Sequence, residues 1–81
     1  MNLNVLFFAA ARDAVGADTL SVEVPSGSTV AELQQLMIRQ TPQLERWSQA
    51  LLWAVNNRYA GSDQVLQPSD VIACFPPVSG G

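Results

Sequence analysis

Two hydrophobic periodicities follow one another in the first half of the chain, and their order restricts the fold more than any other feature. Apolar and polar residues alternate from Asp18 to Val24, which predicts an antiparallel strand with one buried and one solvated face. A second alternating segment, Leu3 to Phe8, precedes it across a turn at 15–17, so we expect the two to form a hairpin. The side chains expected in the core are those of Leu3, Val5, Phe7, Leu20, Val22 and Val24.

A capped amphipathic helix is predicted directly after the hairpin. The segment 25–28 interrupts the strand pattern, and Thr29 and Glu32 have the spacing of a capping box, in which each side chain bonds a backbone amide of the first turn. Thr41-Pro42 ends the helix, because the residue before a proline is disfavoured in helical geometry. The apolar stripe that should face the sheet consists of Val30, Leu33, Leu36 and Met37.

The second half of the chain predicts short elements that complete one sheet. Residues 43–49 suggest a short helical turn, and Asn56-Asn57 suits a tight turn between two strands. The strands expected here are Leu51–Val55, Arg58–Ala60 and Val71–Phe75, with Val65-Leu66 packing back before a turn at 68–70. The fold class is therefore α+β, with about five strands and one main helix on one face of the sheet. The other face is left to solvent or to a partner. Phe8 is its first candidate contact residue, and packing of Phe8 under a loop is equally consistent with the pattern.

The composition excludes several classes of chemistry. The 81-residue chain has a net charge of −3, with four arginines, no histidine and no lysine, so nucleic acid is not an expected partner. A single cysteine and no histidine argue against a disulfide within the chain and a zinc site, and they remove the usual nucleophile–base pairs. We therefore expect no metal and no autonomous catalysis. No apolar run is long enough for a membrane span, and the cytoplasm is the expected location.

Three residues that often carry chemistry are interpreted as structural. Cys74 alternates within the last predicted strand and should be a small buried hydrophobe. Trp47 and Trp53 should pack at the edge of the core, since the basic residues that accompany a base-stacking platform are missing nearby.

The last segment of the sequence is the most distinctive, and it reads Phe75-Pro76-Pro77-Val78-Ser79-Gly80-Gly81. Prolines have fixed φ angles and keep a segment extended, and glycines have no Cβ to obstruct a narrow tunnel. We divide the chain into a folded domain at 1–75 and an extended tail at 76–81. These features suit a tail whose terminal carboxylate enters a partner's active site. A segment that merely ends the last strand is equally consistent with them.

The tail closely resembles the C-terminal pattern Phe-Pro-Pro-Val-x-Gly-Gly of the small subunits of molybdopterin synthase. The resemblance extends over the whole chain, although residues 34–53 are generic. Its matching segments are Val5-Leu6-Phe7-Phe8-Ala9 with Arg12 and Gly16, Ala54-Val55-Asn56, and Asp70-Val71-Ile72-Ala73. It implies a ubiquitin-like β-grasp fold with a mixed sheet.

The resemblance also implies a function. An E1-like adenylyltransferase would use ATP to activate Gly81, whose carboxylate would become a thiocarboxylate, and no cofactor would be bound permanently. The tail would then enter the large subunit of molybdopterin synthase, within a heterotetramer of two large and two small subunits, and deliver the sulfur to precursor Z. The remaining tail residues in this role are Pro76, Pro77, Val78, Ser79 and Gly80. The residues implied at the partner interface are Phe8, Arg12, Tyr59 and Phe75, and Tyr59 stands where the family leads us to expect an aliphatic side chain.

Two alternatives stay open at this point. A sulfur carrier of another pathway, for thiamine, cysteine or tRNA thiolation, would use the same carboxylate chemistry, although such tails lack the Phe-Pro-Pro segment as a rule. A ubiquitin-like interaction module, or a protein modifier joined to lysine amines, would need no sulfur. A chain of copies could not form through side chains, because the sequence has no lysine.

Overall fold

The centre of the fold is a five-stranded mixed sheet with the strand order β2-β1-β5-β3-β4. The computed structural model describes residues 1–47 and 50–76. Its strands are β1 (Asn2–Phe7), β2 (Thr19–Glu23), β3 (Leu52–Val55), β4 (Arg58–Tyr59) and β5 (Val71–Phe75). Its helical elements are α1 (Ala9–Val15), α2 (Val30–Gln40) and the 3-10 helix η1 (Pro42–Trp47). The predicted α+β class, with one main helix on the sheet, is confirmed.

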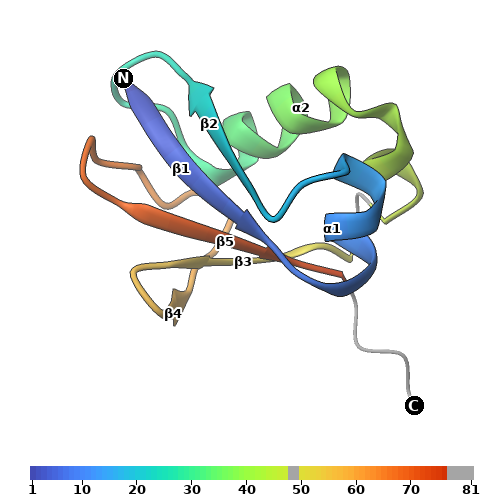
Figure 1. The fold of residues 1–81 in the computed structure, drawn as a ribbon. Coiled ribbons are helices and arrows are strands. Elements are labelled where there is room, and N and C mark those ends of the chain that lie inside the picture. Colours follow the sequence, from blue (N-terminus) through green and yellow to red (C-terminus); the bar gives the residue numbers. More distant parts are fainter. Residues whose placement is uncertain (48–49, 77–81) are drawn as a thin grey trace.

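The two central strands come from opposite ends of the sequence. β1 and β5 run parallel, with Phe7 opposite Cys74, while the β1–β2, β3–β5 and β3–β4 pairs are antiparallel. Figure 1 shows β1 and β5 side by side, with the N-terminus at the end of the pair away from the last residues of β5. The predicted hairpin is therefore present, and β5 inserts between it and β3.

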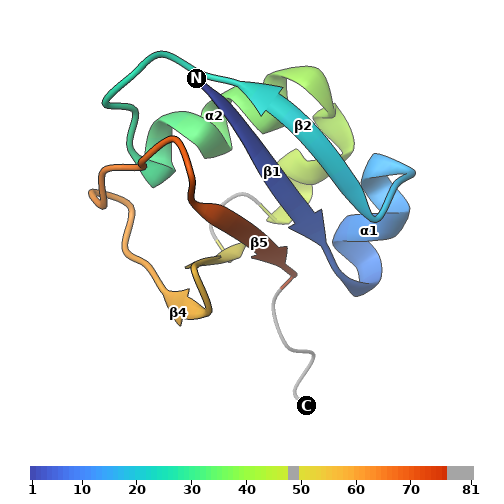
Figure 2. The ribbon, with the colours of Figure 1, turned by 60° about the vertical axis from the view of Figure 1, so that its left-hand side comes forward.

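The main helix, α2, begins at the capping box predicted from the sequence. The backbone amide of Thr29 donates to Oε1 of Glu32 (2.9 Å), and the amide of Glu32 donates to Oγ1 of Thr29 (3.3 Å). The helix gives way at Thr41, before Pro42, and η1 follows it directly. Figures 1 and 2 show α2 lying across one face of the sheet.

The core lies between α2 and this covered face of the sheet. The expected inward residues of β1 are buried, and Leu36 and Leu20 are partly buried against the same cluster. The indole nitrogen of Trp53 donates to Oε1 of Gln34 (2.6 Å), which ties β3 to α2. The buried hydrophobic residues include Leu3, Val5, Phe7, Val22, Val24, Val30, Leu33, Met37, Leu44, Ile72 and Cys74.

The helix α1 is the main departure from the sequence prediction, which placed only a turn at 15–17. The chain reverses at Ala9, whose φ of +53° lies in the left-handed region, and α1 ends at Gly16, with a φ of +83°. The amide of Gly16 donates to the carbonyl of Arg12 (2.8 Å), and Ala11 is fully buried. A seven-residue helix is too short to produce a clear hydrophobic stripe, so only its alanine run and its closing glycine indicated it.

The turn between β3 and β4 is locked to the start of β5. Asn56 and Asn57 have φ values of +52° and +71°, as the predicted tight turn requires. The side chain of Asn56 donates to Oδ1 of Asp70 (2.8 Å) and accepts from the amide of Val71 (2.9 Å). The second carboxylate oxygen of Asp70 accepts from the amide of Gln67 (2.7 Å). This end of the sheet is therefore closed by a polar network.

The predictions made for several individual side chains were confirmed only in part. Leu66 packs back into the core as predicted, but the side chain of Val65 is exposed. Trp53 is buried, whereas Trp47 is half-buried, and the guanidinium of Arg46 lies 5.2 Å above its ring. The expectation that no basic residue lies near the tryptophans was therefore wrong. Within residues 1–47 and 50–76, no helix has the length and apolarity needed to cross a membrane.

Candidate functional site

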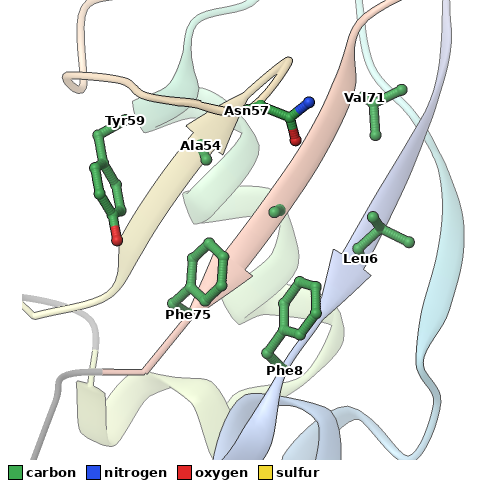
Figure 3. A pocket seen from close by; sticks show the side chains of 8 residues that line it. Leu6, Phe8, Ala54, Asn57, Tyr59, Val71 and Phe75 are labelled. Atoms are coloured by element: carbon green, nitrogen blue, oxygen red, sulfur yellow. The ribbon is translucent and has the colours of Figure 1, made fainter.

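An apolar groove lies on the face of the sheet that α2 leaves open. Its volume is about 270 Å³, and Figure 3 shows side chains from β1, β3, β4 and β5 around it. The hydroxyl of Tyr59 lies at its β4 side, and the polar side chain of Asn57 lies at the end of the groove near the β3–β4 turn. The lining residues are Leu6, Phe8, Ala54, Asn57, Tyr59, Val71, Ala73 and Phe75.

The alternation of the central strands explains why this groove is apolar. Successive side chains of a strand point to opposite faces, so the strand that buries Val5 and Phe7 must present Leu6 on the other side. In β5 the same rule buries Ile72 and leaves Val71 on the groove side, 47% exposed. Both strands carry hydrophobic residues on both faces although α2 covers only one of them. An uncovered apolar face of this kind is typical of a partner interface.

Three aromatic rings gather where β1 and β5 end. The rings of Phe8 and Phe75 are stacked, with centroids 4.8 Å apart and an interplanar angle of 9°. The ring of Tyr59 meets Phe75 edge-on at 6.3 Å, and 76% of this tyrosine is exposed. Figure 3 shows the stacked pair side by side and Tyr59 on the β4 side of Phe75. The structure thus brings together three of the four residues implied at the partner interface.

Arg12, the fourth of these residues, lies apart from the groove. It is on α1, and its Nε is 3.9 Å from Oδ1 of Asp13 and 3.7 Å from Oδ1 of Asp18. Its side chain is half exposed, so the two long contacts leave it accessible. A role for Arg12 at an interface stays a prediction, and it would extend that interface from the groove to the α1 side.

The groove adjoins the base of the predicted tail. Phe75 is the last residue of β5, where it pairs with Leu52, and Pro76 follows it at once. The amide of Phe8 donates to the carbonyl of Cys74 (3.3 Å), so the residue before Phe75 is held by β1 as well. The other predicted tail residues, Pro77, Val78, Ser79, Gly80 and Gly81, lie outside the described part of the chain. The proposed boundary at residue 75 and the role of Gly81 therefore stay predictions.

Cys74 is on the covered face of β5, next to this site but unable to reach it. Its side chain is fully buried, and burial raises the pKa of the thiol from 9.0 to about 12. A thiol with that pKa is a poor nucleophile at neutral pH, because the reactive thiolate is almost absent. The prediction that Cys74 is a small core residue is confirmed.

Comparison with known proteins identifies relatives over the full length of the chain. The ThiS family model matches residues 5–81. The molybdopterin synthase sulfur carrier subunit of Escherichia coli is 40% identical, over 98% of this chain and 99% of the relative. The similarity therefore includes both the groove strands and the final glycines.

Solved structures show the same fold. SAMP1 from Haloferax volcanii is 26% identical, with a TM-score of 0.86 and full coverage of both chains. A protein–protein complex of subunits 1 and 2 of molybdopterin-converting factor from Helicobacter pylori contains a chain that is 23% identical, with a TM-score of 0.68 and full coverage of both chains. The ubiquitin-like β-grasp fold implied by the sequence resemblance is confirmed. The chain belongs to the ThiS family and is a relative of the molybdopterin synthase sulfur carrier subunits.

Proposed function

We propose that this protein is the sulfur carrier subunit of a molybdopterin synthase and that the carboxylate of Gly81 carries the sulfur. The observation that supports this most directly is that the groove strand β5, the aromatic residue Phe75 and the tail follow one another along the chain. β5 runs along the apolar groove and ends in the stacked Phe75, and Pro76 and the glycine-terminated segment follow directly in the sequence. The folded domain can thus dock while the last residues enter a partner's active site.

The chemistry needs activation, because an ionised carboxylate is a poor electrophile. An α-carboxyl group has a pKa of about 3.5 and is fully ionised at neutral pH. In the proposed reaction an oxygen of the Gly81 carboxylate attacks the α-phosphorus of ATP on an E1-like enzyme, and pyrophosphate leaves. Sulfide (HS⁻) then attacks the carbonyl carbon, AMP leaves, the sulfur loses its proton, and a thiocarboxylate remains. The thiocarboxylate would pass its sulfur to precursor Z on the large synthase subunit, in the cytoplasm.

The open face supplies the docking surface in this scheme. Phe8, Phe75 and Tyr59 form an exposed aromatic cluster at the point where the tail begins. A partner that covers the groove would bury this cluster and place its own active site within the reach of six residues, about 20 Å. The complex of subunits 1 and 2 described for the Helicobacter pylori protein supports a large subunit as that partner. A heterotetramer with two copies of each subunit is part of this proposal.

Mass spectrometry of the intact chain tests the carrier chemistry. The chain is incubated with a sulfur-carrier activating enzyme, ATP and a sulfide source, and we expect one oxygen to be exchanged for sulfur. A chain without Gly81 should show no exchange while its far-UV circular dichroism stays unchanged. The Escherichia coli relative serves as a positive control for the enzyme. An unmodified chain beside a converted control would contradict the proposal.

Binding to a synthase large subunit separates this function from the alternatives. We expect stable co-purification with the large subunit, and we expect Phe75→Ala to weaken it, because Phe75 is the centre of the aromatic cluster. Thiocarboxylate formation without such binding would instead support a carrier for thiamine, cysteine or tRNA thiolation. Retention of full activity by the chain without Gly81 would support an interaction module.

A further inference from the structure

Every cationic side chain of this protein is an arginine. The four are Arg12, Arg39, Arg46 and Arg58, and the sequence has neither lysine nor histidine. Arginine stays protonated at any physiological pH and does not attack carbonyl groups, whereas a lysine amine has a pKa of about 10.4 and its free form is a good nucleophile. This distinction matters for a chain that carries an activated acyl group.

Two of these arginines lie close to the base of the tail. Arg58 precedes Tyr59, whose ring meets Phe75, and from the strand register we estimate about 14 Å between the Cα atoms of Arg58 and Phe75. Arg12 lies one helical turn beyond Phe8, its amide donating to the Phe8 carbonyl (3.3 Å), and Phe8 stacks on Phe75. The six residues after Phe75 span up to about 20 Å. A lysine at position 58 or 12 would therefore be within reach of the Gly81 carbonyl.

The other nucleophilic groups of the chain are buried or lie far from the base of the tail. Cys74 is fully buried. The α-amino group of Met1 donates to the carbonyl of Val24 (2.7 Å) at the start of β1. Because β1 and β5 are parallel and Phe7 faces Cys74, this amine lies about 20 Å from Phe7, at the opposite end of the sheet from Phe75. Hydroxyl groups remain, but they need an adjacent general base to attack, and histidine, the most common one, is absent from the sequence.

We propose that the surface of this protein is kept free of nucleophiles that could capture its own activated Gly81, so that the acyl group passes only to a nucleophile supplied by another molecule. The biological relevance of this proposal rests on the proposed function, in which Gly81 is activated. A consequence is that transfer to an amine of another protein attaches a single copy, because the attached chain has no side-chain amine to accept a second one.

A chemically prepared thioester tests the proposal without an activating enzyme. The full chain is made with a C-terminal thioester of 2-mercaptoethanesulfonate by intein cleavage and held at about pH 8.5, where roughly 1% of lysine amines are unprotonated. In self-capture an amine nitrogen attacks the thioester carbonyl, a C–N bond replaces the C–S bond, the thiolate leaves and the amine loses a proton. The α-amine of every chain is acetylated beforehand, so that only side-chain nucleophiles are compared. For the wild-type chain we then expect hydrolysis only, with no internally linked chain and no covalent dimer.

The variant Arg58→Lys should restore self-capture. We expect an internally linked chain, one water lighter than the hydrolysed chain, at more than about tenfold the wild-type level, because the amine and the carbonyl are held at high effective concentration. Ser69→Lys is the matched control: position 69 is exposed and lies in the turn before β5, at the end of that strand opposite to Phe75. The tail would have to fold back along the whole of β5 to reach it, so we expect much less internal product than for Arg58→Lys. Circular dichroism checks that all three chains are folded.

Added free lysine should consume all three thioesters at the same rate, which shows that the acyl groups are equally reactive. Self-capture by the wild-type chain at the level of Arg58→Lys would overturn the proposal. So would an Arg58→Lys chain that forms no internal product while free lysine consumes its thioester, or a Ser69→Lys chain that closes as fast as Arg58→Lys. A failure of the proposed function would be seen separately, as a missing sulfur exchange with the activating enzyme.

Discussion

The two faces of β1 and β5 have similar apolar side chains and opposite environments. On the covered face, Val5, Ile72 and Cys74 are fully buried. On the open face, Phe8 and Val71 are 42% and 47% exposed. The same alternation that builds the core therefore builds the groove, and only the position of α2 distinguishes them. This comparison separates residues that hold the fold together from residues that are available to a partner.

The largest expected difference lies between two neighbouring residues of β5. Ile72→Ala should lower the free energy of unfolding by about 2–5 kcal/mol, because it opens a cavity in the core. Val71→Ala removes a β-branched side chain from the same strand but leaves no cavity, so we expect less than about 1 kcal/mol. Urea unfolding of both variants measures the difference. Equal losses would mean that the open face also stabilises the fold.

A smaller effect is expected from pH, and it should come from Cys74 on the covered face. Burial holds the pKa of Cys74 at about 12, against 9.0 in its ordinary state. Below about pH 9 both states keep the proton; above it the unfolded chain loses the proton first, so stability falls as the pH rises toward 12. Between about pH 8 and pH 10.5 we expect a loss of about 2 kcal/mol.

The variant Cys74→Ala is the control for this pH effect. It should be less stable at neutral pH, because a buried side chain is truncated, but the cysteine-dependent part of the alkaline loss should disappear. Urea unfolding at several pH values compares the two chains. Parallel curves would show that Cys74 is less shielded than the structure indicates.

The smallest effect is expected on the open face, from the stack between Phe8 and Phe75. A double-mutant cycle with Phe8→Leu and Phe75→Leu should give a coupling energy of about 0.5–1 kcal/mol, near the low end for aromatic pairs because Phe8 is partly exposed. Leucine keeps the apolar character and removes the ring, so the cycle isolates the stacking. A coupling energy near zero would mean that the rings are held in place by the strands alone.

Much of the fold could be predicted because its strongest signals are local. Alternation located β1, β2 and β5, and the Thr29–Glu32 spacing located the start of α2, since both patterns act over a few residues. The Asn56-Asn57 pair located the turn between β3 and β4 for the same reason. The sequence resemblance supplied the mixed pairing, which no local pattern indicates.

The parts that could not be predicted depend on residues far apart in the sequence. The bonds of Asn56 with Asp70 and Val71 require the β3–β4 turn to meet the start of β5. The edge-on contact of Tyr59 with Phe75 follows from the strand order, and the separation of Arg12 from the groove follows from its place on α1. The helix α1 was missed because seven residues give too little periodicity for a hydrophobic stripe.

The parallel pairing of β1 and β5 makes the aromatic surface depend on the folding of both ends of the chain. During synthesis the β1–β2 hairpin is made early, but the second edge of β1 stays unpaired until β5, near the other end of the sequence, becomes available. Phe8 directly follows β1 and Phe75 ends β5, so the stacked aromatic pair forms only once the two ends of the chain have met. We therefore expect a partner that binds this surface to bind the fully folded chain in preference to partly folded chains.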